Sequence, residues 1–361
     1  MDIKHSYTPF LKFKTNEVAG LSALSSELKS EITPFFDLPR KNGMTRGAFE
    51  KSVESSYKKT EKYLAEFPYI FIDSFDIPDS IAQIGSPNCR VVIEEFVDIE
   101  YVPVLGLDRA ADHNQAIIDA KAADEIISDR VAVRFQPDEF ASFSLIQDEL
   151  IELITAGAPV FSHWIFVFDC RVCLVSNRKK LATDIANFVT AAIGAIDAVV
   201  VQKYIVVGSS IPATITDIAR PSDESVIARA ELEIFHTAQA MVGADVLSLG
   251  DYTIVSPTYS ELTIAPELLL SVTAPKVFYA FENNHYIARG GRIKTNGYGQ
   301  YDDICVEIVN KKFYRKAPYS WGDKFIKMRA DGFRDKNVTP STILKPTICA
   351  HITYMALGYP A

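Results

Sequence analysis

Several acidic side chains stand where apolar runs of the sequence end. Asp37, Asp73 and Asp169 each close a short apolar run, and Asp108 closely follows another. If these runs are parallel strands of one barrel, their carboxyl ends meet at the same mouth, and the four carboxylates converge there. Paired carboxylates at such a mouth carry out acid–base chemistry or hold a divalent metal beside a phosphate. We therefore treat these four aspartates as candidate catalytic residues.

Four nitrogen-bearing side chains occupy comparable positions, and we treat them as candidate ligand-binding residues that hold an anion: Lys12, Lys14, Arg134 and Gln136. A structural interpretation competes with this one, because an aspartate after a strand often caps the next helix or stabilises a turn. The two interpretations predict different structures. Functional carboxylates face one concave pocket, whereas capping carboxylates point to separate helix ends.

Other motifs carry less chemical information. Cys170-Arg171-Val172-Cys173 is a CxxC, but no second Cys or His pair at zinc spacing accompanies it, so we expect structural thiols. The six histidines are scattered, and neither a zinc-protease motif nor a GxSxG nucleophile motif occurs. Arg289-Gly290-Gly291-Arg292 offers backbone amides between two cations, which is typical of an anion site or of a surface glycine turn. We add Arg289 to the candidate ligand-binding residues; the sequence specifies no cofactor and no metal site.

The elements that position these residues follow a repeating pattern of strand and helix. Short apolar runs, nearly continuous in character as in parallel strands covered on both faces, lie at 7–12, 32–37, 68–73, 101–106, 131–136, 163–169, 199–207 and 252–256. Apolar residues recur at helical spacing in 16–30, 46–66, 111–127, 144–156, 178–196 and 223–241, while 74–100 is irregular. The number and length of these units predict an α/β fold, a (β/α)₈ TIM-like barrel over residues 1–275.

An open, doubly wound sheet is the main alternative to the barrel. In a dinucleotide-binding sheet the first strand leads into a glycine-rich phosphate turn. Here it leads into Lys12-Phe13-Lys14-Thr15-Asn16-Glu17, which contains no glycine. The sequence therefore favours the barrel.

Composition divides the chain into two electrostatic parts. The 361 residues are 48% hydrophobic and 23% charged, which excludes a disordered chain and a disulfide-rich mini-domain. Residues 1–275 hold 23 Lys and Arg against 39 Asp and Glu, whereas 276–361 hold 14 against 7. We predict that residues 276–361 form an appended, basic and aromatic-rich α+β extension, with a hairpin turn at Asn283-Asn284.

The sequence also bears on location and partners. The most apolar stretch, from Ile185 to Gly208, is interrupted by Asp197, Gln202 and Lys203 and is typical of a helix followed by a buried strand rather than a membrane span. Five cysteines without a framework spacing, and no signal segment, predict a cytoplasmic protein without membrane association.

The basic extension has two interpretations. Cations among aromatic residues bind single-stranded nucleic acid, but the same composition suits docking on the acidic barrel, which we favour because the basic excess is modest. Nucleic-acid binding predicts one continuous positive surface built from Lys311, Lys312, Arg315, Lys316 and Lys324.

A series of short motifs in fixed order resembles the bacteriophage "beta protein" family. The motifs are Tyr7-Thr8-Pro9-Phe10-Leu11-Lys12-Phe13-Lys14, Glu17, Ile32-Thr33-Pro34-Phe35-Phe36-Asp37-Leu38-Pro39, Gly250-Asp251-Tyr252, Ala274-Pro275-Lys276, Arg289-Gly290-Gly291, Tyr319-Ser320-Trp321-Gly322-Asp323 and His351-Ile352. The resemblance spans nearly the whole chain and implies a barrel-like domain with a C-terminal extension and a role in phage–host conflict. It supplies no catalytic residues. The first motif departs from the family, because Lys12-Phe13-Lys14 stands where a tryptophan-containing variant is expected.

Three functional hypotheses follow. The first is a recognition protein of phage defence or counter-defence that binds a protein or nucleic-acid partner through the barrel mouth and the extension. The second is a barrel hydrolase of a phosphate ester or glycoside, in which Asp37, Asp73 and Asp169 act as acid–base groups or metal ligands while Lys12 and Arg134 hold the anion. The third is a nucleic-acid-binding factor that uses the extension alone.

Overall fold

Within residues 6–196, 200–259 and 269–359, which a computed structural model describes, eight parallel strands form a closed barrel. The strands, in order around the ring, are β1 (Tyr7–Lys12), β2 (Phe35–Asp37), β3 (Phe71–Asp73), β4 (Val102–Leu105), β5 (Arg130–Phe135), β6 (His163–Val172), β7 (Val201–Ser209) and β9 (Leu247–Asp251). The last strand, β9, closes the ring by pairing with both β7 and β1. The predicted TIM-like fold class is therefore confirmed.

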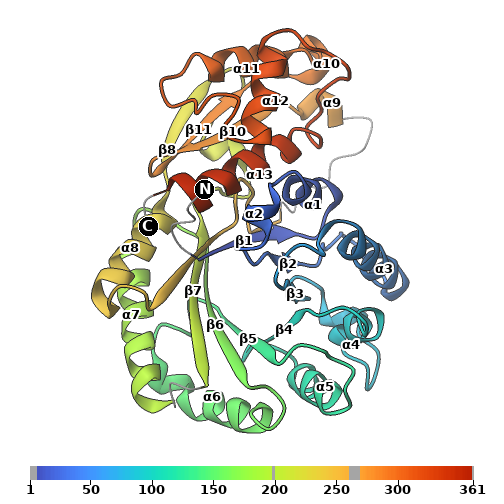
Figure 1. Cartoon of the computed structure of the whole chain (residues 1–361), viewed down its shortest axis with the longest axis vertical. Helices are drawn as coiled ribbons and strands as arrows, with labels where there is room; N and C mark the ends of the chain where they lie inside the picture. The colour runs from blue at the N-terminus through green and yellow to red at the C-terminus, as the bar shows by residue number, and fades with distance from the viewer. Residues whose placement is uncertain (1–5, 197–199, 260–268, 360–361) are drawn as a thin grey trace.

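Helices cover the outside of the barrel (Figure 1). They are α1 (Thr15–Ser22), α2 (Ser26–Lys29), α3 (Arg46–Tyr63), α4 (Asn88–Glu95), α5 (Ala111–Ala122), α6 (Phe143–Gly157), α7 (Arg178–Ala195) and α8 (Ala230–Val242), with short 3₁₀ turns at Asp79–Ile81 and Ile215–Asp217. The predicted helix at 16–30 is two helices, because Ser25 caps a new helix by accepting a hydrogen bond from the amide of Leu28. The irregular interval 74–100 contains α4.

The barrel interior is packed with aromatic and branched side chains. The rings of Phe10, Phe35 and Phe71, on three consecutive strands, stack with centroids 4.2 and 5.2 Å apart. A larger apolar layer lies between the strands and the surrounding helices. Because the interior is filled, the barrel is not a channel, and any ligand site must lie at its ends.

Two predicted elements are wrong. The eighth strand was expected at 252–256 but lies at β9, and residues 252–256 form the loop that follows it. Thr253 has a φ of 56°, a left-handed conformation that ends an extended strand. The helix expected at 223–241 begins only at Ala230, because Glu224–Ala228 forms strand β8 instead. Its pairing partner comes about 60 residues later in the chain, so a local pattern does not reveal it.

The extension is built on a small antiparallel sheet in the order β10 (Lys276–Phe281), β11 (Asn284–Arg289), β8. The predicted hairpin is thus present, but its turn is Glu282-Asn283 and not Asn283-Asn284, because Asn284 already pairs with Phe281 as the first residue of β11. Helices α9 (Leu269–Val272), α10 (Ile293–Asn296), α11 (Gln300–Val309), α12 (Trp321–Ala330) and α13 (Leu344–Thr353) follow the chain, and a π-helical turn at Tyr354–Gly358 ends it. Figure 1 shows α13 between the extension and the barrel, and α13 contacts both α1 and α12.

The apolar stretch 185–208 is the end of α7 followed by β7, as predicted, apart from residues 197–199, which lie outside the described residues. In the described ranges, none of the helices combines the length and apolar character that crossing a bilayer requires.

The motif Tyr319-Ser320-Trp321-Gly322-Asp323 joins α12 to its neighbours. Ser320 caps α12 by accepting a hydrogen bond from the amide of Asp323, and the buried Asp323 carboxylate accepts one from the Tyr279 hydroxyl. A Cβ at Gly322 would overlap the carbonyl oxygen of Pro346 and lie 2.8 Å from the amide nitrogen of Ala350. Gly322 therefore lets α12 approach α13 closely.

We expect Gly322→Ala to lower the free energy of unfolding by about 1–3 kcal/mol, because the added methyl group forces two helix backbones apart. Chemical denaturation followed by circular dichroism measures the change. Gly194→Ala in α7 is the control, because no atom lies within 4 Å of a Cβ at Gly194. Equal stability of the two variants would contradict the close packing of α12 on α13.

Candidate functional site at the carboxyl end of the barrel

Arg134, on β5, lies at the centre of a buried ion-pair network, which we call the Arg134 network. Its Nη1 donates to Asp37 at 2.6 Å and to Asp73 at 2.8 Å, while its Nε and Nη2 donate to Asp169 at 3.1 and 2.7 Å. Nη2 also donates to the hydroxyl of Tyr252, which in turn donates to Asp169. All five residues are at most 1% exposed.

Strand register explains why these side chains meet. Asp37 of β2 pairs with Asp73 of β3, and Lys12 of β1 pairs with Asp37. The three residues therefore stand at one level of the barrel, at the carboxyl ends of neighbouring strands. The predicted convergence of Asp37, Asp73 and Asp169 is thus observed, together with Arg134, but the acids meet around a cation and not around an open pocket.

Further arginines hold the carboxylates ionised. Burial by itself raises the pKa of Asp73, but Arg109 and Arg134 outweigh it, so the pKa lies below its ordinary value. The pKa of Asp169 is likewise lowered, because the effects of Arg134 and Arg171 outweigh that of its burial. Arg109 donates to both oxygens of Asp73, at 2.9 and 3.2 Å. Carboxylates held this way are poor proton donors near neutral pH.

Phe75 covers the arginines on the side of the mouth. The guanidinium carbons of Arg134, Arg109 and Arg171 lie 4.5, 4.7 and 5.0 Å from the centroid of its ring. The negative face of an aromatic ring attracts such cations. Phe75 and the arginines therefore separate the Arg134 network from solvent.

The remaining predicted residues are dispersed. Asp108 lies beside Arg109, with 3.7 Å between its carboxylate and Nε of that arginine. Gln136 donates its backbone amide to Glu139, and its side-chain nitrogen is buried without a hydrogen-bond partner in the described part of the chain. In the described part of the chain, neither side chain forms a hydrogen bond or ion pair with Arg134.

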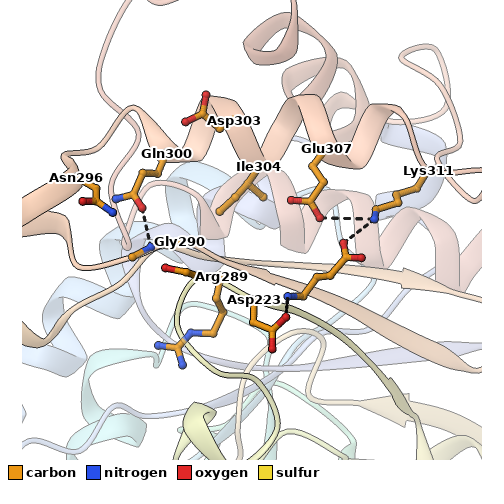
Figure 2. Close-up of a pocket in the computed structure, with 12 residues that line it drawn as sticks. Asp223, Arg289, Gly290, Asn296, Gln300, Asp303, Ile304, Glu307 and Lys311 are labelled. Carbon is orange, nitrogen blue, oxygen red and sulfur yellow. Dashed lines mark hydrogen bonds and ion pairs between the residues drawn. The ribbon is translucent and has the colours of Figure 1, made fainter.

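Arg289 lies in the extension and not at the barrel mouth. Its Nη1 donates to the carbonyl of Ala219 at 2.8 Å. The amide of Gly290 donates to Pro275, and the amide of Gly291 donates to Gln300 at 2.7 Å (Figure 2). The two glycine amides that would hold an anion are therefore already engaged.

Lys12 and Lys14 line a cavity of about 350 Å³ between the barrel mouth and the extension, which we call the cationic cleft. Loops after β1, β7 and β9 form one side of it, and β10 and the segment before α13 form the other. Among the described residues, three lysines (Lys12, Lys14, Lys276) and one acid (Glu17) line it. Hydroxyls of Ser256, Thr258, Tyr259 and Thr347 and apolar side chains complete the lining.

Lys12 is the most enclosed cation of the cleft. Its Nζ lies 3.1 Å from the ring centroid of Tyr259, 3.3 Å from the carbonyl of Pro257 and 3.9 Å from the Asp76 carboxylate. Burial lowers the pKa of Lys12 to about 8, although Asp76 opposes the shift. Burial raises the pKa of Glu17 to about 7, and burial with the nearby Asp37 raises that of Asp76 to about 6. Three ionisable groups at or behind the cleft therefore titrate near neutral pH.

Sequence patterns did not single out several residues of the mouth. Tyr252 belongs to the Gly250-Asp251-Tyr252 motif, and Arg171 lies within the CxxC whose two cysteines are buried free thiols. Asp76 follows β3 by three residues, in the irregular interval. In the ranges 6–196, 200–259 and 269–359, His, Cys, Asp and Glu side chains form no group arranged to hold a metal ion.

A second buried network joins the barrel to the extension. Asp251, at the end of β9, accepts hydrogen bonds from Arg229 and from Tyr7, and it lies 2.9 Å from Nε2 of His351. Arg229 also pairs with Glu231 at 2.8 Å. Two of the sequence motifs, Gly250-Asp251-Tyr252 and His351-Ile352, therefore meet in space.

We expect Arg134→Met to destabilise the protein by about 3–5 kcal/mol at pH 7, because three buried carboxylates lose their shared partner. We also expect the pH dependence of stability to have opposite signs in the wild type and in Arg134→Met. In the wild type, Asp73 and Asp169 have lowered pKa values, so their contribution is present above about pH 4 and is lost as the pH falls further. In the variant, burial without Arg134 raises carboxylate pKa values, so stability increases as the pH falls from 7.

Urea denaturation at pH 7 and 5.5 measures both effects. Arg130→Met is the matched control on the same strand, because Arg130 makes a partly exposed ion pair with Glu100 and contributes little. If Arg134→Met and Arg130→Met were equally stable, the Arg134 network would not hold the barrel together.

Comparison with known proteins supports the resemblance seen in the sequence. The model of the Beta protein family matches residues 7–357, which include every barrel strand and the extension. No curated protein matches the chain as a relative. Over nearly its whole length, the chain belongs to the Beta protein family.

Proposed function

We propose that this protein is a recognition protein that binds a phosphate-bearing ligand in the cationic cleft. The observation that carries the proposal is the meeting of Lys12, Lys14 and Lys276 around one cavity at the carboxyl end of the barrel, where Glu17 is the single acid among the described lining residues. A surplus of positive charge in a partly enclosed cavity attracts anions and strengthens their binding.

The position of the cleft within the fold supports this ligand class. In (β/α)₈ barrels, the loops after the seventh and eighth strands frequently form a phosphate site. Here β7 and β9 are the seventh and eighth barrel strands, and residues after both of them, such as Ala213 and Ser256, line the cleft. This support rests on similarity of fold alone. The lysines of the cleft supply the positive charge that a phosphate group requires.

Apolar residues of the cleft suggest what the rest of the ligand is like. Ile211, Ile254 and Phe278 line it together with the lysines. A ligand with a phosphate group and an aromatic or apolar body, such as a nucleotide, suits both parts of this lining. The phage–host conflict implied by the family resemblance, with nucleic acid as the partner, is the setting that we propose for this recognition.

We favour the cleft over the surface of the extension as the phosphate site. Of the five cations expected to form a continuous surface, Lys311 pairs with Glu224 and Glu307. Arg315 donates to the carbonyl of Ala280, and its guanidinium lies over the rings of Tyr279 and Tyr354. These two cations are engaged within the extension, which leaves Lys312, Lys316 and Lys324 exposed.

A second candidate function is hydrolysis of a phosphate ester. The observation that favours it is the Asp76 carboxylate, which lies behind Lys12 and has one buried oxygen without a hydrogen-bond partner in the described part of the chain. A carboxyl group with a pKa of about 6 beside a lysine with a pKa of about 8 suits proton transfer near pH 7. In this reading Asp37, Asp73 and Asp169 position the site and take no part in proton transfer.

We expect sulfate, which keeps its double negative charge between pH 6.5 and 9, to bind in the cleft in competition with inorganic phosphate. Its affinity falls at least about tenfold between pH 6.5 and 9, because Glu17 gains its negative charge near pH 7 and Lys12 loses its proton near pH 8, where an ammonium–anion contact of about 1.4 kcal/mol is lost. Lys14→Met weakens binding to a similar extent and leaves the fold intact, because Lys14 is exposed. Isothermal titration calorimetry measures both changes.

Two exposed lysines provide matched controls. Lys51→Met, on α3, removes the same charge far from the mouth, and Lys312→Met removes it from the extension. Both variants bind sulfate as the wild type does if the cleft is the site. Weakening by Lys312→Met equal to that by Lys14→Met would place the anion on the extension and overturn the proposal.

Phosphatase activity tests the second candidate. If Asp76 transfers a proton, the wild type hydrolyses p-nitrophenyl phosphate, and Asp76→Asn loses at least about 100-fold in kcat while keeping its sulfate affinity. A wild type without activity, or an Asp76→Asn variant as active as wild type, would leave binding as the function of the cleft.

A further inference from the structure

A second cavity opens at the same end of the barrel, on the loops after β3 and β4. It measures about 320 Å³, and we call it the acidic cavity. Asp79, Asp108 and Asp112 line it together with Asn88, Arg109 and His113. Its lining shares no residue with that of the cationic cleft.

Negative charge in the acidic cavity exceeds positive charge. Arg109 is the single cation among its lining residues, and two of its contacts go to Asp73 in the Arg134 network. His113 adds no charge at neutral pH, because burial and Arg109 lower its pKa. The Asp108 side chain is partly buried, which raises the pKa of its carboxyl group. Asp108 already lies 3.7 Å from Nε of Arg109, whereas Asp79 and Asp112 form no ion pair among the described residues, so the lining carries a surplus of negative charge that attracts a cation.

The lining of the acidic cavity also contains a buried hydrogen-bond acceptor that has no partner among the described residues. Asn88 is 4% exposed and lines the cavity, and its side-chain nitrogen donates to the carbonyl of Pro78 at 3.0 Å. Its side-chain oxygen, in contrast, has no hydrogen-bond partner among the described residues. Buried amide oxygens are normally satisfied, and leaving one without a partner is destabilising. The missing partner is a hydrogen-bond donor.

We propose that the acidic cavity binds a primary ammonium group. An ammonium carries three N–H donors and one positive charge, so it satisfies the Asn88 oxygen and offsets the surplus negative charge of the lining. The proposal does not depend on the phosphate site, because the two cavities are lined by different residues.

The ammonium has two possible sources, a small diamine or a lysine side chain of a polypeptide. Putrescine is the probe for the first, and Nα-acetyl-lysine methylamide is the probe for the second. Both are titrated into the full-length protein by calorimetry at constant ionic strength, with 1,4-butanediol as the uncharged analogue of putrescine. The tighter of the two binders identifies the source, and the diol does not bind.

Asp112→Asn is the main variant, and the extension offers a closely matched control. Asp112 and Asp303 are both exposed acids in the first turn of a helix, and each lines a separate cavity, Asp303 that of Figure 2. Asp112→Asn weakens ammonium binding three- to tenfold, whereas Asp303→Asn leaves it unchanged. Asn88→Leu weakens binding to a similar extent by removing the unsatisfied acceptor.

Several outcomes would overturn the proposal. They are an absence of binding by both ammonium probes, equal binding of the diol, and equal weakening by Asp112→Asn and Asp303→Asn. If Asn88→Leu does not fold, Asp112→Asn alone decides the outcome. Lys14→Met leaves ammonium binding unchanged, so a failure of the phosphate proposal and a failure of this one are separately visible.

Discussion

The arrangement of charged side chains at the barrel mouth depends on one buried guanidinium, that of Arg134. A charge removed from water is tolerated only where it is paired and its hydrogen bonds are satisfied. Arg134, on β5, meets this requirement through three acids. Asp37 and Asp73 come from the neighbouring strands β2 and β3, and Asp169 comes from β6, which pairs with β5. The arginine and the acids are therefore interdependent, since removing the cation leaves the carboxylates unpaired.

Because the centre of the barrel mouth is closed, the charged groups that a ligand could contact lie at the periphery of the mouth. Because the Arg134 network is saturated and covered by Phe75, its carboxylates are not available to a ligand. The surplus charges lie instead on the surrounding loops, with lysines around the cleft beside the extension and aspartates around the cavity after β3 and β4. One end of the barrel thus presents regions of opposite sign, which direct ligand groups of opposite charge to different places.

The sequence predicted the barrel and most of its strands, because continuous apolar runs and helical spacing are local patterns. It also predicted that Asp37, Asp73 and Asp169 converge, since strand ends share one mouth. It could not predict their partner, because assigning Arg134 to carboxylates and not to a ligand depends on contacts between residues 35 to 97 positions apart. Strand β8 was missed for the same reason. The cleft was found only in part, because Lys12 and Lys14 are local signals whereas Lys276 comes from the extension.

Two consecutive residues, the last of β9 and the one that follows it, connect the two buried networks. The side chain of Tyr252 reaches the Arg134 network, while that of Asp251 binds Arg229 and His351 beneath the extension. Successive side chains of a strand point to opposite faces, so this short segment holds the barrel interior on one face and the extension on the other. The loop that continues from it, with Ser256 and Tyr259, then lines the cationic cleft. We therefore expect a ligand in the cleft to contact a segment anchored in both parts of the molecule, so that its binding depends on the packing of the extension on the barrel.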